Sequence, residues 1–210
     1  RLGLDASLFP ELHRCDAIVG QVTGGAAGAT GLAAGTPVAA GQVDCNAGWV
    51  GAGAIEDGDI QMNLGTCGNF GIIHSAPVFH RSMIAFNYTT DSEKVFITVP
   101  TTTTGGQLLR YMRDNYYQAE LAAEKKGGAE VYGLMNAEAR TAPPGSGGLV
   151  VLPFLMGERT PIWDVDARGV VFGLSLSHTR GHLIRAMMES VAYALYDSFR
   201  IIADTGQKIN

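Results

Sequence analysis

The stretch GDIQMNLGTCGNFGII (residues 58–73) carries the clearest strand signal in the chain. From Ile60 to Leu64 apolar and polar side chains alternate, which is the period of a β-strand. A glycine-flanked turn, Gly65–Gly68, follows, and FGII (70–73) leads back along the first strand. The stretch therefore predicts a β-hairpin.

The residues after this hairpin predict further strands and one helix. VFITV (95–99) is typical of a strand, and Gly105-Gly106 ends the threonine run that follows it. Apolar residues at helical spacing predict a helix over 107–117. The segment AEKKGG (123–128) is expected to be an exposed linker. The remaining predicted strands are LVVLPFL (149–155), as a continuous buried strand, and residues 168–174.

The last helix has the strongest periodicity of the chain. Its apolar residues recur at i, i+3, i+4 and i+7, and either Ser177 or Thr179 can cap its N-terminus. The stripe consists of Ile184, Met187, Met188, Val191, Leu195, Phe199 and Ile202. Strands followed by two helices that cover the sheet predict an α/β layered domain from about residue 58 onward.

The residues before the hairpin are small and rich in glycine. PVAAG (37–41) predicts a short buried strand, and Asp44 follows it as the expected N-cap of a helix over 45–55. Since ligands of α/β sheets gather where strands end, Asp44 can also act as a general base. Both interpretations of Asp44 remain open at this level.

Composition excludes several classes of protein. Of 210 residues, 46% are apolar and 17% are charged, so the chain can bury a core. Fifteen basic and 20 acidic residues give a net charge of −5, which argues against a nucleic-acid or membrane-surface protein. No apolar run reaches the roughly 18 residues of a membrane span. Three cysteines without a CxxC pair predict no disulfide framework, so a cytoplasmic location is expected.

Two further motifs have a functional and a structural interpretation. In LGTCG (64–68) the backbone N–H groups of a glycine-flanked turn can bind an anion, helped by the Thr66 hydroxyl, but such turns also occur in ordinary hairpins. His178 and His182 have the i, i+4 spacing of two metal ligands. Because no third ligand lies nearby in the sequence, a solvated helix end is the favoured interpretation, and no metal residue is predicted.

Taken together and in order, these pieces resemble the FGGY carbohydrate kinases, the family of xylulose, ribulose and glycerol kinases. The matching stretches are GLAAGTPVAAGQVD (31–44), GDIQMNLGTCG (58–68), GGQLLRYMRD (105–114), GLVVLPFLMGERTPIWDVDARGVVFGLSLSHTR (148–180) and MMESVAYALYDS (187–198). The resemblance covers nearly the whole chain.

The resemblance implies a fold of the actin and Hsp70 type, in which two ribonuclease H-like domains, each a mixed sheet flanked by helices, enclose an active-site cleft. Residues 1–57 would form the end of the first, sugar-binding domain. Residues 58–210 would form most of the second, nucleotide-binding domain, without its adenosine motif. Because the phosphate motif that opens the first domain is also absent, the chain is expected to be a piece of a longer protein and inactive alone.

The resemblance also implies site residues. Asp44 matches the catalytic base, and Cys45 takes the following substrate-contacting position, where many members carry Gln or Asn. Gly65 and Thr66 match the turn that binds the phosphates of ATP. Gly106 matches a glycine that approaches the nucleotide. Arg110 takes a place where some members carry a Gln that contacts the nucleotide, so it is counted among the expected ATP-binding residues.

The implied activity is ATP-dependent phosphorylation of a sugar hydroxyl, with a pentulose such as xylulose as the expected acceptor. The expected cofactors are ATP and Mg²⁺, and a homodimer is expected to be possible. Asp44 would accept the hydroxyl proton as the oxygen attacks the γ-phosphorus. Two alternatives stay open: a non-catalytic binding module of the same superfamily, suggested by Cys45 and the missing motifs, and a small metal site at His178 and His182.

Overall fold

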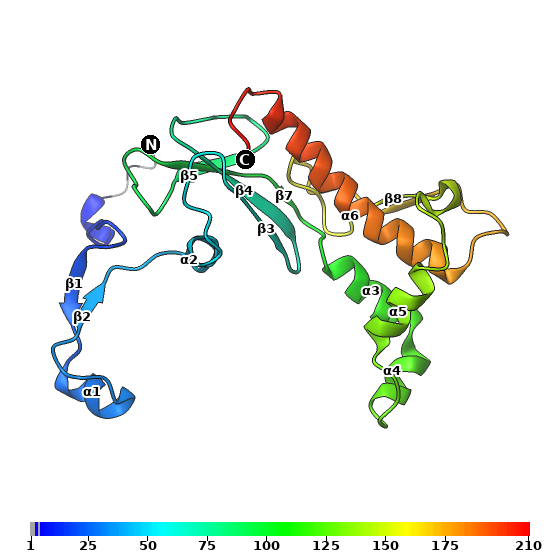
Figure 1. The fold of residues 1–210 in the computed structure, drawn as a ribbon, viewed down its shortest axis with the longest axis horizontal. Coiled ribbons are helices and arrows are strands. Elements are labelled where there is room, and N and C mark those ends of the chain that lie inside the picture. The colour runs from blue at the N-terminus through cyan, green and yellow to red at the C-terminus, as the bar shows by residue number, and fades with distance from the viewer. Residues whose placement is uncertain (1–2, 4) are drawn as a thin grey trace.

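The computed structural model describes residue 3 and residues 5–210. Figure 1 shows a body made of a central sheet and one long helix. A helical subdomain (residues 107–139) lies on one side of this body, and a small arm that contains residues 18–39 lies on the other. The strands are β1 Ile18–Gln21, β2 Pro37–Ala39, β3 Ile60–Leu64, β4 Gly68–His74, β5 Ile84–Asn87, β6 Phe96–Val99, β7 Thr101–Thr102, β8 Val150–Leu152 and β9 Val170–Phe172. The helices are α1 Gly24–Thr30, α2 Asp44–Gly51, α3 Gln107–Tyr116, α4 Gln118–Glu124, α5 Val131–Ala139 and α6 Arg180–Ala203, with 3-10 turns at Ala6–Leu8 and Ser146–Gly148.

The central sheet has the strand order β3-β4-β6-β5, and β7 continues beside β4. The predicted hairpin is confirmed: β3 and β4 pair antiparallel, with Leu64 opposite Gly68 and Ile60 opposite Ile72. The strand predicted at 95–99 is confirmed as β6. In the described residues this sheet contains antiparallel pairs only.

Each face of the sheet has its own core. On one face Phe70 and Ile72 of β4 pack against buried side chains of α3, α5 and α6. On the other face Ile73 and Ile97 pack with Trp49 of α2. This division follows from the two-residue period of a strand, which sends neighbouring side chains to opposite faces.

The long helix α6 is confirmed, and its cap is Thr179. The Thr179 side chain bonds the backbone at His182, and the His182 ring accepts the Thr179 N–H in return. Of the predicted stripe, five side chains are buried, namely those of Ile184, Met187, Val191, Leu195 and Ile202. The helix predicted at 107–117 is also confirmed, as α3.

Several predictions upstream of the hairpin are wrong in detail. The strand predicted at 37–41 is only β2, and it is exposed rather than buried because it pairs with β1 alone. Asp44 is the first residue of α2 instead of its N-cap, since Val43 holds the cap position, and α2 ends at Gly51 rather than near residue 55.

Other predictions fail downstream of the hairpin. The linker predicted at 123–128 begins inside α4, and neither α4 nor α5 was predicted. The core under the sheet therefore draws on three helices rather than two. The strand predicted as buried at 149–155 is shortened to β8, because Pro153 cannot donate to a sheet ladder, and only Val151 of its three residues is buried. The strand predicted at 168–174 is shortened to β9 and is exposed.

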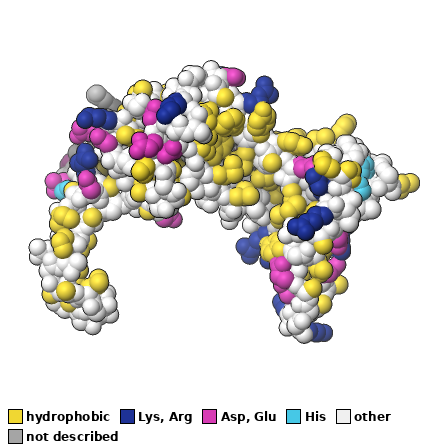
Figure 2. Space-filling view, in the orientation of Figure 1, with side chains coloured by type: hydrophobic (Ala, Val, Ile, Leu, Met, Phe, Trp, Pro, Cys, Tyr) yellow, Lys and Arg dark blue, Asp and Glu magenta, His cyan; other side chains and the backbone are white. Residues whose placement is uncertain are grey.

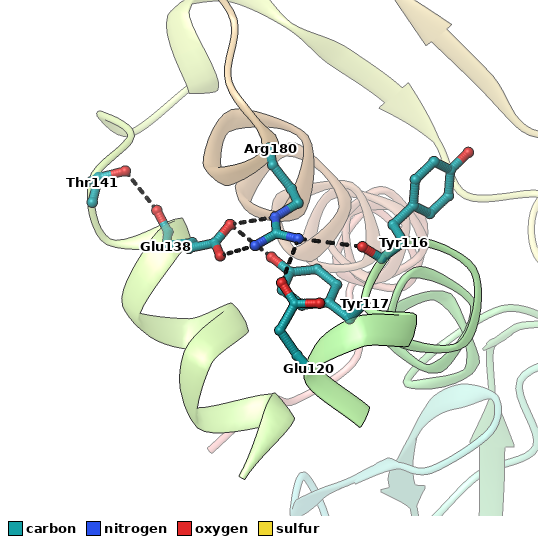
Figure 3. Close-up of polar contacts among 6 residues, drawn as sticks. All are labelled: Tyr116, Tyr117, Glu120, Glu138, Thr141 and Arg180. Carbon is teal, nitrogen blue, oxygen red and sulfur yellow. Dashed lines mark hydrogen bonds and ion pairs between the residues drawn. The ribbon is translucent and has the colours of Figure 1, made fainter. Parts of the chain in front are cut away.

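Arg180 joins the helical subdomain to the start of α6 (Figure 3). Its guanidinium bonds both carboxylate oxygens of Glu138 on α5 and lies 2.9 Å from Glu120 Oε1 on α4. It also stacks 3.9 Å from the ring centre of Tyr117, whose hydroxyl donates to Glu138 at 2.8 Å. The hydrogen bonds from Arg180 lower the pKa of Glu138, while burial raises the pKa of Tyr117.

Replacing Arg180 by lysine is expected to lower the free energy of unfolding by about 1–2 kcal/mol, because an ammonium cannot reproduce the forked contact with Glu138. The expected loss of stability is modest because the Arg180 side chain is 39% exposed, so solvent screens its ion pair with Glu138. The matched control is Arg200→Lys on the same helix, which is exposed and should change stability by less than about 0.5 kcal/mol. Urea denaturation measures both, and equal effects would contradict the assigned role.

His74 at the end of β4 is a buried titratable group, 1% exposed. Neither ring nitrogen has a hydrogen-bond partner in the described chain. Burial lowers its pKa below the usual 6.5, although the carboxylate of Asp57 opposes this shift. Because the unfolded chain then binds the proton more tightly than the folded chain, protonation favours unfolding.

We therefore expect stability to fall as the pH drops below about 6.5, by at most about 1.4 kcal/mol per pH unit for this one group. In His74→Leu that part of the pH dependence should disappear, whereas His13→Leu, at an exposed histidine, should keep it. Urea titrations between pH 5 and 8 measure the slope. An unchanged slope in the His74 variant would refute the assignment.

Candidate functional site

The turn between β3 and β4 is fixed from one side by the N-terminus of α3. The Gly105 N–H donates to the Thr66 carbonyl at 2.8 Å, and the Gly106 N–H donates to the Gly65 carbonyl at 2.7 Å. Within the turn the Gly65 N–H donates to the carbonyl of Cys67 at 3.0 Å. The structure thus brings together Gly65, Thr66 and Gly106, three of the residues that the sequence predicted for nucleotide binding.

This contact leaves no room for a side chain at Gly105 or Gly106, which directly precede α3. A Cβ atom at Gly105 would lie 2.4 Å from the carbonyl carbon of Cys67, and one at Gly106 would lie 2.7 Å from the oxygen of Gly65. Atoms that are not bonded do not approach so closely without displacing the backbone. The glycine pair therefore sets the distance between the helix and the turn.

The turn retains donors for a ligand. Gly65 and Thr66 are exposed, and within the described chain neither the N–H nor the hydroxyl of Thr66 donates to another group. The carbonyls of the turn are already bonded to α3, whose N-terminal end carries a partial positive charge. Free donors beside a positive helix end suit an anion such as a phosphate group.

Arg110 lies one helical turn beyond Gly106, and its N–H donates to the Gly106 carbonyl at 3.1 Å. Its side chain is 60% exposed, and its Nε lies 3.6 Å from Asp114 Oδ2. The guanidinium therefore pairs along α3 in this structure rather than with the turn.

Asp44 opens α2 with an exposed side chain, whose Oδ1 accepts the N–H of Cys45 at 2.7 Å. Trp49 fixes this helix to the sheet, because its buried side chain packs with Ile73 of β4 and Ile97 of β6. Figure 1 shows α2 and α6 on opposite sides of the hairpin. No hydrogen bond of the described residues connects Asp44 to the turn, and no ion pair among them includes this carboxylate.

Cys45, the other predicted substrate contact, is half-buried. Its thiol lies 3.6 Å from Asn46 Oδ1, and the side chain packs at the margin of the core around Trp49. All three cysteines of the chain are free thiols.

On the α6 side of the hairpin an apolar cavity of about 480 Å³ adjoins Gly105 and Gly106. Figure 2 shows apolar side chains gathered over this region, between β3 and α6. The cavity offers almost no hydrogen-bond donors, so a phosphate group fits only at the turn itself. Its apolar lining consists of Ile60, Met62, Leu64, Phe70, Leu109, Met188, Val191, Ala192, Leu195, Tyr196 and Phe199.

The histidine pair belongs to the start of α6. The His178 Nδ1 accepts the Ser175 N–H at 3.0 Å, and the His182 Nδ1 accepts the Thr179 N–H at 3.2 Å. In the described part of the chain no group of three or more histidine, cysteine or acidic side chains could hold a metal ion. These local bonds support the helix-end interpretation.

The family model for the C-terminal domain of the FGGY family of carbohydrate kinases matches residues 61–210. The chain belongs to the FGGY family of carbohydrate kinases. It is 34% identical to a gluconokinase of Bacillus subtilis over 169 residues, covering 80% of this chain and 33% of that protein. It is 29% identical to a xylulose kinase of Staphylococcus epidermidis over 205 residues, covering 97% of this chain and 39% of the relative.

Solved FGGY kinase structures share the fold. The xylulose kinase from Rhodospirillum rubrum superposes with a TM-score of 0.79 at 29% identity, over 99% of this chain and 40% of that one. The xyloylose kinase from Brucella ovis gives 0.80 at 26% identity, over 99% and 40%. The predicted α/β fold of the actin and Hsp70 type is thereby confirmed. The chain spans about two fifths of the length of these FGGY kinases, and none of its described helices is long and apolar enough to cross a membrane.

One buried acidic group escaped the sequence analysis. Glu158 is 3% exposed, and it accepts hydrogen bonds from the Thr102 hydroxyl and the Thr103 N–H. In the sequence Glu158 belongs to the stretch ERTP (158–161). A glutamate flanked by glycine and arginine is typical of a surface loop, so the local pattern does not predict its burial.

The close approach of α3 to the turn predicts the effect of a methyl group there. Gly105→Ala should lower the free energy of unfolding by about 1–3 kcal/mol, because the backbone must move to accept the Cβ atom. Gly48→Ala is the matched control: it lies inside α2 with open space around it and should be neutral or stabilising by up to about 1 kcal/mol. Thermal denaturation compares the two, and a stable Gly105→Ala would contradict the geometry.

Proposed function

We propose that the protein carrying this chain transfers the γ-phosphoryl group of ATP to a hydroxyl group of a sugar, with a pentulose such as xylulose as acceptor. The carrying observation is the convergence of Gly65, Thr66 and Gly106 on one turn with free donors. Membership of the FGGY family supports the reaction class. Because the chain spans only part of its relatives, the proposal concerns the full-length protein.

The proposed acceptor is inferred from the similarity of this chain to sugar kinases and not from contacts with a sugar. The two structures named above are xylulose kinases by their descriptions, and they cover nearly the whole chain, which favours a pentulose. The higher identity to a gluconokinase makes gluconate the second candidate. Both compounds present a row of hydroxyl groups, so the same chemistry at the phosphate serves either one.

In this proposal residues 1–57 form the end of the sugar-binding domain and residues 58–210 form most of the nucleotide-binding domain. Asp44 is the general base: it is exposed, free of ion pairs in the described chain, and mounted on a helix that Trp49 fixes to the sheet. Accepting the hydroxyl proton would raise the rate by about 10²- to 10⁴-fold. Cys45 would lie beside the substrate.

On the nucleotide side the turn would bind phosphate oxygens through the N–H and hydroxyl of Thr66, while Gly106 allows close approach and Arg110 contacts the nucleotide. Mg²⁺ prefers phosphate oxygens, water and one or two carboxylates. In this proposal the Mg²⁺ ion arrives bound to the phosphate oxygens of ATP. The ion would neutralise charge on the phosphates during transfer.

The primary experiment is a coupled assay of ADP release by the full-length protein against ketoses, polyols and gluconate. Acceptor-dependent ADP release with xylulose supports the proposal, and release with gluconate alone would reassign the acceptor. If no acceptor stimulates release while the protein still binds ATP, the non-catalytic binding module is the better description.

Asp44→Asn is expected to lower kcat for sugar phosphorylation by about 10²- to 10⁴-fold, because the amide cannot accept the hydroxyl proton. The dissociation constant of ATP, measured by calorimetry, should change little, since Asp44 makes no contact with the turn. Asp197→Asn, at an exposed position on α6, is the matched control and should leave kcat unchanged. Full activity of the Asp44 variant would refute the assignment of the base.

A further inference from the structure

Glu158 is unusual for a buried glutamate because none of the ion pairs in the described chain includes it. Carboxylates are almost never fully buried without a partner. Hydrogen bonds stabilise this carboxylate in place of a positively charged side chain. The Thr102 hydroxyl donates to Oε2 at 2.6 Å, and the N–H groups of Thr103 and Arg159 donate to Oε1 at 2.9 and 2.6 Å. Such charge-assisted bonds are the strong ones.

The loop that carries Glu158 is itself fixed to its surroundings. Glu158 and Asp164 exchange two backbone hydrogen bonds, of 2.8 and 2.9 Å. The Thr160 N–H donates to the Thr101 carbonyl at 3.0 Å, and the Thr160 hydroxyl donates to the carbonyl of Ser82 at 2.9 Å. The carboxylate is therefore held in place from several sides before it contacts the threonine run.

A short path leads from this carboxylate to the nucleotide side of the site. Thr102, which Glu158 holds, pairs with Gly68 at the start of β4. Three residues further along the chain, Gly105 donates to the Thr66 carbonyl, and Gly106 donates to the Gly65 carbonyl. Only Thr103 and Thr104 separate Thr102 from the glycine pair, so the contacts of Glu158 lie within a few residues of the contact between the glycines and the turn.

We propose that Glu158 is a positioning residue for the Gly65–Cys67 turn. Its hydrogen bonds to Thr102 and Thr103, called the clamp below, set where Gly105 and Gly106 meet the turn. Glu158 touches neither nucleotide nor sugar in this assignment. The inference rests on the proposed function of the turn as the phosphate-binding element. It extends that function to a residue on a different loop that is distant from the turn in the sequence.

The test compares Glu158→Ala with the wild type in the full-length protein. Loss of the clamp should raise the KM for ATP on the order of 10- to 100-fold, as expected when a binding element is displaced by about an ångström. The KM for the sugar should stay unchanged. Glu158→Gln keeps an oxygen that can accept the Thr103 N–H, so it should recover most of the affinity for ATP.

Glu189→Ala is the matched control. Glu189, on α6, also accepts a backbone N–H, from Gly145 at 3.0 Å, and it lies near the Ser146 hydroxyl, but that loop does not contact the turn. If Glu158 had only a structural role, both alanine variants would lose stability and neither would change the KM for ATP. That result would overturn the proposal.

Amide hydrogen exchange separates this inference from the proposed function. In Glu158→Ala the N–H groups of Gly105 and Gly106 should exchange faster than in the wild type, while Glu189→Ala leaves them unchanged. If the wild type phosphorylates no acceptor, the proposed function fails, and exchange still decides whether Glu158 positions the turn. Should Glu158→Ala not fold, Thr102→Val, which removes only one donor to the carboxylate, must show the same shift in exchange. Unchanged exchange in that variant would refute the clamp.

Discussion

The site depends on two backbone hydrogen bonds, from Gly105 and Gly106 to the carbonyls of the hairpin turn. They form because neither residue has a side chain, so the start of α3 can approach the turn to contact distance. With the carbonyls occupied, Thr66 presents its donors beside the positive end of a helix. The anion binding proposed for the turn thus depends on the contact between two segments about 40 residues apart and on neither segment alone.

The hairpin also separates two environments. Phe70 and Ile72 face α6 and the larger core, while Ile73 on the opposite face of β4 packs with Trp49 of α2. This second contact places α2, and with it Asp44, on the other side of the sheet from α6. The proposed general base and the proposed phosphate-binding turn therefore belong to different packing layers of one sheet.

Elements whose signal is local were predictable. The alternation in β3, the glycine-flanked turn and the apolar stripe of α6 depend on neighbours in the sequence, and the structure confirms all three. Predictions failed where tertiary context decides. PVAAG (37–41) reads as buried, but β2 is exposed because only β1 pairs with it. The helix α5 has a weak pattern of its own, and Val131 and Met135 are apolar positions that are buried against the core.

The family and the residue types proposed for the site follow from the amino-acid sequence, because the glycines, Thr66 and Asp44 stand in motifs that can be recognised without coordinates. The hairpin was predictable as well, since strand periodicity depends only on the order of adjacent residues. Packing in three dimensions was needed to show that Gly105 contacts the turn and that Glu158 is buried. These facts depend on which distant segments share a surface, and no local pattern of side chains records that choice.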